Sequence, residues 1–75
     1  MQLEKINFHY LRLADEIEGK IMEGEYAAGD KLPSLRKLHK ELNFSITTVY
    51  QAYIELEKRG IVEPRIKSGF YVKPF

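Results

Sequence analysis

The chain has 75 residues, contains no Cys and carries a formal net charge of +1 at pH 7. This length makes one domain, residues 1–75, with one small core, and is too short for most enzyme folds that need a deep, closed active site. The lack of Cys excludes a disulfide framework and a zinc finger. The lack of Cys also fits a cytoplasmic protein, which is what we expect. No membrane segment and no signal peptide are predicted, because the sequence has neither a bilayer-length apolar run nor a positive patch followed by a short apolar stretch at its start.

The charges are unevenly distributed along the chain. Residues 1–30 carry three Lys or Arg and seven Asp or Glu, whereas residues 31–75 carry nine and four. An acidic half and a basic half suggest a molecule with one face turned toward an anion, although chance clustering of solvated charges gives the same counts.

The first predicted element is an amphipathic helix at about residues 8–23. Apolar residues recur at intervals of four from Leu13 to Ile21, which is the spacing of one helical face. Asn7 is the expected N-cap and Gly24 the expected stop. Three acidic side chains of this helix are expected to face water: Asp15, Glu16 and Glu18.

Two shorter helices are predicted next, at about 35–42 and 45–59. Ser34 and Ser45 suit the two N-caps, because a serine hydroxyl accepts a hydrogen bond from a free N–H of the first turn. Asn43 lies where the chain must reverse and tolerates the left-handed conformation. Two capped helices joined by a tight turn are the outline of a helix-turn-helix.

After Gly60 the hydrophobic pattern changes from helical to strand-like. Residues 61–63 and 70–72 are predicted strands, and the short loop between them holds two cations. The predicted fold is therefore mainly α with a small β-hairpin. It is a winged helix-turn-helix with three helices and a two- to three-stranded wing, in which residues 74–75 begin a linker.

Catalysis is not expected. His9 and His39 have no metal-ligand partner at helical spacing, so no metal site is predicted. Ser34 and Ser45 stand where caps belong, which gives neither the surroundings of a nucleophile.

DNA binding is the function that this pattern favours, because a helix N-terminus with polar side chains can contact base edges and phosphates. Ile46 and Tyr50 suit contacts with thymine methyl groups or with the sugar-phosphate edge. The second interpretation is a winged-helix protein–protein interaction module, in which the apolar outer face formed with Ile54 packs on a partner. The residues expected to contact DNA are Arg36, Ser45, Ile46, Thr47, Thr48, Tyr50, Arg65, Lys67, Ser68 and Gly69.

Residues 10–73 resemble the DNA-binding domain of the GntR family of bacterial transcription regulators. The resemblance rests on segments 29–38, 45–49 and 56–62 taken together. Segment 68–72 is most similar to the MocR branch, in which this domain precedes a large aminotransferase-like domain that binds pyridoxal phosphate. The resemblance therefore implies no cofactor in this chain and pyridoxal phosphate only in a downstream domain.

The resemblance also implies how DNA is bound. The third helix would enter the major groove and the wing would contact the adjacent groove or backbone, in a homodimer on an inverted repeat of double-stranded operator DNA. The family's contacts fall on Arg36, on residues 47–48 and on residues 67–69. Ile46 and Tyr50 stand where the family often has Arg, so two cations of the usual interface are missing.

Overall fold

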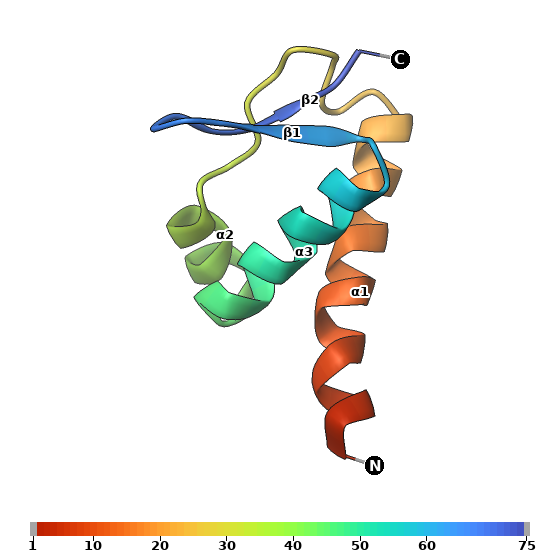
Figure 1. The fold of residues 1–75 in the computed structure, drawn as a ribbon, viewed down its shortest axis with the longest axis vertical. Coiled ribbons are helices and arrows are strands. Elements are labelled where there is room, and N and C mark those ends of the chain that lie inside the picture. The colour runs from red at the N-terminus through yellow and green to blue at the C-terminus, as the bar shows by residue number, and fades with distance from the viewer. Residues whose placement is uncertain (1, 75) are drawn as a thin grey trace.

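The computed structural model describes the backbone of residues 2–74 and the side chains of residues 9–74. Three helices precede one hairpin (Figure 1), which confirms the predicted winged helix-turn-helix. No helix in this described part is long and apolar enough to cross a membrane. The elements are α1 (Gln2–Met22), α2 (Leu35–Leu42), α3 (Ile46–Lys58), β1 (Val62–Arg65) and β2 (Gly69–Val72).

The long helix α1 begins at Gln2, well before the predicted start at residue 8. Asn7 therefore lies inside the helix, and its predicted role as N-cap is wrong. The residues before it are mostly good helix formers, so no stop signal precedes it. The other end is as predicted, because Gly24 takes a φ of 92° and its N–H and that of Glu25 donate to carbonyls of the last turn.

The two helices of the helix-turn-helix both begin at hydroxyl caps. Ser34 Oγ accepts the N–H of Lys37 at 3.1 Å, and Ser45 Oγ accepts the N–H of Thr48 at 3.0 Å. Asn43 ends α2 in the left-handed conformation, with φ 61° and ψ 28°. These local interactions explain why the predicted boundaries of both helices are confirmed to within a residue.

The core lies between α1, α3 and the inner side of the hairpin. One stripe of α3 is almost completely buried, with exposed fractions of 0–1%. The core residues supplied by α1, α3 and the strands are Leu13, Ala14, Ile17, Ile21, Val49, Ala52, Tyr53, Leu56, Val62 and Val72.

The wing is an antiparallel hairpin in which Val62 pairs with Val72 and Arg65 pairs with Gly69. A third strand is reduced to one bridge between Lys31 and Tyr71. Because this bridge lies on β2, β1 is the edge strand. Pro64 fits there, since an edge strand tolerates a residue without an N–H.

Candidate nucleic-acid interface

The amino-terminal half of α3 is presented to solvent, as the sequence predicts. Ile46 and Tyr50 keep 43% and 49% of their surface exposed, and Thr47 is exposed beside them. The opposite stripe of the helix, which includes Val49 and Tyr53, is buried against the core. The helix therefore offers its first turns to a partner without disturbing the fold.

The neighbouring residues Thr47 and Thr48 lie in different surroundings. Thr48 is half-buried, and its Oγ1 accepts a hydrogen bond of 2.9 Å from the hydroxyl of Ser45. Ser45 in turn accepts the N–H of Thr48, so both hydroxyls take part in the cap. Thr47 is the member of the pair whose side chain is exposed and available to a ligand.

The outer surface of α2 is basic. Arg36 is exposed in the first turn, with Lys37 beside it and Lys40 in the last turn. Within the side chains that the structure describes, none of these three cations forms an ion pair. Lys37 and Lys40 were not among the predicted contacts, although their charges were visible in the sequence.

Arg65 at the wing is held by its own hairpin. Its guanidinium lies 4.0 Å from the centroid of the Tyr71 ring, and its Nη2 donates to a carboxylate oxygen of Glu63 at 3.2 Å. The hydroxyl of Tyr71 is hydrogen-bonded to that of Ser68. Tyr71, which the sequence did not single out, thus positions two of the predicted contact residues.

The tip of the wing is a tight turn, closed by a hydrogen bond of 3.0 Å from the N–H of Ser68 to the carbonyl of Arg65. Lys67 has a φ of 62° and Gly69 a φ of 137°, a value that side-chain-bearing residues rarely adopt. The turn therefore explains Gly69 without reference to DNA. Ile66 is 92% exposed at this tip, and the sequence analysis did not identify it.

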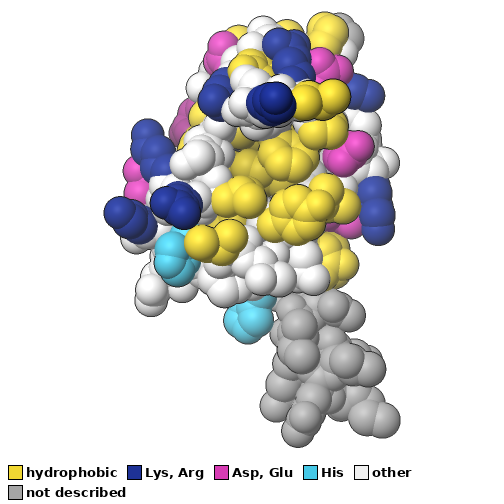
Figure 2. All heavy atoms as spheres, turned by 60° about the vertical axis from the view of Figure 1, so that its left-hand side comes forward, with side chains coloured by type: hydrophobic (Ala, Val, Ile, Leu, Met, Phe, Trp, Pro, Cys, Tyr) yellow, Lys and Arg dark blue, Asp and Glu magenta, His cyan; other side chains and the backbone are white. Residues whose placement is uncertain are grey.

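The face that contains α2, the start of α3 and the wing has an apolar centre. Figure 2 shows hydrophobic side chains in a band across this side of the molecule, with most of the Lys and Arg side chains near its edges.

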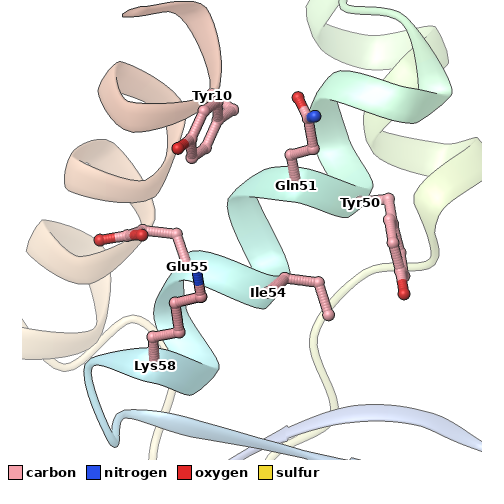
Figure 3. A pocket seen from close by; sticks show the side chains of 6 residues that line it. All are labelled: Tyr10, Tyr50, Gln51, Ile54, Glu55 and Lys58. Atoms are coloured by element: carbon pink, nitrogen blue, oxygen red, sulfur yellow. The ribbon is translucent and has the colours of Figure 1, made fainter. Parts of the chain in front are cut away.

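A shallow hollow of about 290 Å³ lies between α1 and α3. In Figure 3, Tyr10 faces α3 across this hollow, whereas Tyr50 and Ile54 point away from α1.

Tyr53 of α3 contacts two of the neighbouring parts of the fold, the segment before α2 and the strand β2. Its hydroxyl donates to the carbonyl of Pro33 at 2.7 Å, and its ring packs edge-on against Phe70 with centroids 5.1 Å apart. Burial raises the pKa of the Tyr53 phenol above its ordinary value. One side chain of α3 therefore contacts both the segment before α2 and the strand β2.

The acidic side of α1 is not wholly solvated. Asp15 keeps 69% of its side chain exposed and faces water as expected, whereas Glu18 is partly buried with 34% exposed, which corrects the expectation for that residue. Arg59 Nη1 donates to Asp15 at 2.9 Å and to Glu18 at 2.7 Å, while its Nε donates to Glu55 at 3.0 Å. The hydrogen bond to Glu18 raises the pKa of Arg59 most strongly. This cluster attaches the end of α3 to α1. It also pairs one cation of the basic half of the chain with acidic side chains of the other half.

His39 has a structural role. Its Nδ1 donates to the carbonyl of Phe44 across the turn of the helix-turn-helix. Within the described residues, no group of three or more His, Cys, Asp or Glu side chains could hold a metal ion.

The chain matches the family model of bacterial regulatory proteins of the gntR family over residues 9–72. It is 43% identical over 63 residues to the uncharacterized HTH-type transcriptional regulator YjiR of Escherichia coli K12, covering 84% of this chain and 13% of that protein. It is 44% identical over 63 residues to the Exu regulon transcriptional regulator of the same organism, covering 84% and 24%.

The fold is shared with YtrA from Sulfolobus acidocaldarius, a GntR-family transcription factor. The match has a TM-score of 0.82 and 38% identity, and covers 88% of this chain and 69% of that one. The two curated relatives are named as transcriptional regulators rather than as enzymes, and this chain spans less than a quarter of the length of each. The chain therefore belongs to the gntR family of bacterial regulatory proteins.

Proposed function

We propose that this chain is the DNA-binding domain of a bacterial transcription regulator and that it binds double-stranded operator DNA. Helix α3 enters the major groove by its amino-terminal end, and the wing at residues 65–69 contacts the adjacent groove or backbone. The observation that carries this proposal is the exposure of Ile46, Thr47 and Tyr50 at the start of a helix whose opposite stripe is buried.

Electrostatics supports the same orientation. The free N–H groups at the start of α3 favour an anion such as a phosphate. Arg36 on α2 and Lys67 at the wing tip are exposed cations on the two elements that flank α3. Phosphate contacts from both sides would set the position of α3 in the groove, while its own side chains read the bases.

Salt dependence of operator binding tests the proposal. Fluorescence anisotropy with an operator selected from a random duplex library, at about 50 and 200 mM salt, should show affinity falling steeply as counterions are released. Arg36→Ala and Lys67→Gln should each weaken binding to all sequences and reduce the salt slope by about 1. Affinity that ignores salt, or no binding even at low salt, would refute the proposal.

We also propose that two copies bind an inverted repeat, because a two-fold dimer matches a two-fold DNA site. Native mass spectrometry should find two chains on a full inverted repeat and one on a half-site. One chain on both duplexes would contradict the dimer.

The proposed place of the domain is in a cytoplasmic regulator of the MocR branch, supported by the resemblance of segment 68–72. In that setting pyridoxal phosphate would belong to a downstream aminotransferase-like domain and not to this chain. The gene sequence beyond Phe75 tests the branch, since it should encode such a domain.

A protein-binding function is the second candidate, because Ile46 and Tyr50 are exposed apolar side chains on α3. It requires a stable oligomer in which α3 is covered. Size-exclusion chromatography with light scattering, with and without operator DNA, separates the two functions: an oligomer that excludes DNA supports the second, and DNA binding supports the first.

A further inference from the structure

The amino-terminal part of α3, residues 46–54, carries no charge. Every residue from Ile46 to Ile54 is neutral, and the basic residue of the helix, Lys58, lies in its last turn. The nearest acid along the helix, Glu55, is paired with Arg59. A groove that received the first two turns of α3 would therefore meet hydroxyl, amide, aromatic and aliphatic groups alone.

This composition limits which bases the helix can recognise. In the major groove, guanine is most often read by Arg or Lys through O6 and N7, and cytosine by an acidic side chain through N4. The exposed turns of α3 offer neither. Thymine differs from the other bases in its C5-methyl group, which apolar side chains contact.

Ile46 and Tyr50 have the geometry for such contacts. They are four residues apart, so they lie on one face with their Cβ atoms about 5–6 Å apart. That distance corresponds to one or two base-pair steps of about 3.4 Å. Both side chains are nearly half exposed, and Tyr50 points away from α1 in Figure 3.

We propose that Ile46 and Tyr50 determine operator specificity by contacting thymine methyl groups, so that the base pairs beneath the first two turns of α3 are A·T. This inference rests on the proposed DNA-binding function and specifies the class of sequence that it recognises. The two methyl groups would lie one or two base pairs apart in each half-site.

The experiment removes the methyl groups one at a time. An operator is selected with this chain from a random duplex library, and each thymine is then replaced by deoxyuridine, which keeps every hydrogen-bonding group and lacks the methyl. We expect two positions per half-site at which affinity falls about fourfold, the effect of exposing one buried methyl group.

Protein variants assign each position to a side chain. Ile46→Ala should weaken binding and abolish the deoxyuridine effect at one position, and Tyr50→Ala should do so at the other. Met22→Ala is the matched control, because it removes another exposed apolar side chain, at the end of α1, and should leave both effects unchanged. Circular dichroism of the variants should match the parent chain, since both side chains are half exposed.

The outcomes separate this inference from the proposed function. Tight, salt-dependent binding without a deoxyuridine effect would overturn the inference and leave DNA binding intact. A deoxyuridine effect that persists in both Ala variants would also overturn it. Failure to bind any selected duplex at low salt would overturn the proposed function and the inference together.

Discussion

Adjacent residues of the same type have different roles at the start of α3. The hydroxyl of Thr48 completes the cap with Ser45, whereas Thr47 is exposed beside Ile46. Spacing alone does not separate them, because both lie in the first turn after the cap. The hydrogen bond from Ser45 makes the distinction, and it leads to opposite expectations for the two substitutions.

Thr47→Ala should weaken binding to the cognate operator by about 1–3 kcal/mol and relax its specificity, if Thr47 contacts a base edge. The melting temperature should not change, because this side chain is exposed. Thr48→Ala is the contrasting variant and should lower the free energy of unfolding by about 1 kcal/mol through loss of its hydrogen bond. Thermal melts and anisotropy titrations check both, and equal binding losses for the two variants would contradict the assignment.

Tyr53→Phe should lower the free energy of unfolding by about 1–3 kcal/mol. The partly buried carbonyl of Pro33 loses its donor, while the ring stays packed against Phe70. Urea unfolding at neutral pH measures the change. Tyr50→Phe serves as the control, because its ring is half exposed, and a loss as large as that of Tyr53→Phe would refute the explanation.

The same residue predicts how stability changes in alkali. Because burial raises the pKa of Tyr53, the folded state disfavours the phenolate. The contribution of neutral Tyr53 to the free energy of unfolding is therefore fully present below the ordinary tyrosine pKa of about 10 and is lost as the pH rises above it. Urea unfolding at rising alkaline pH should show a shallower decline for Tyr53→Phe than for the parent chain, and equal declines would contradict this cause.

At the scale of elements, two side chains of the wing hold Arg65 in place and partly neutralise its charge. Arg65 is stacked on Tyr71 and also paired with Glu63 on the same strand. The stacking orients the guanidinium, while the carboxylate offsets its charge. In the proposed complex, Arg65 would thus be a prearranged phosphate contact whose charge is partly offset by Glu63.

Glu63→Gln should raise the affinity for DNA and steepen its salt dependence. The substitution removes a negative charge near the wing tip and leaves Arg65 over the Tyr71 ring. Anisotropy titrations at two salt concentrations measure the effect. Glu16→Gln is the control for net charge, since Glu16 is exposed on α1, and an equal gain there would show that overall charge is the cause.

The elements that sequence predicts well are those set by local chemistry. Ser34, Asn43 and Ser45 define α2 and the start of α3 through contacts within a few residues, so their boundaries could be placed in advance. The start of α1 could not, because the residues before Asn7 carry no signal that stops a helix. The sequence left open whether the wing has two or three strands, because the single bridge at Lys31 depends on Tyr71 of β2, 40 residues later.

The candidate site was predictable in outline for the same reason. A helix pattern assigns Ile46, Thr47 and Tyr50 to one exposed face, and the structure agrees. The stacking of Arg65 on Tyr71 was not predictable, because it requires the register of the two strands.

At the scale of the whole molecule, ion pairs between the acidic and the basic half of the chain neutralise part of the charge difference between them. Arg59 belongs to the basic half of the sequence but is bound by Asp15 and Glu18 of the acidic half, across more than 40 residues. Residues 31–75, which the charge distribution predicts to face an anion, therefore present fewer cations than their composition suggests. The acids of α1 serve to hold α3 as well as to interact with water.

Arg59→Met should lower the free energy of unfolding by about 1 kcal/mol, because a partly exposed ion-pair network contributes modestly. Methionine keeps much of the apolar stem, so the change reports mainly on the charge. Urea unfolding at low and high salt checks this, and the difference from the parent chain should shrink at high salt. A difference that does not depend on salt would point to packing instead.

The attachment of Tyr53 to both Pro33 and Phe70 has a consequence for the shape of the DNA. Tyr53 of α3 packs directly on Phe70 of β2, so the spacing between α3 and the wing is set by a contact inside the protein. In the proposed complex, a duplex whose groove spacing differs from this one must bend or twist to contact both α3 and the wing. The energy of deforming the DNA then contributes to the affinity. Two operators with identical contacted bases would be bound unequally if the steps between them differ in pliability.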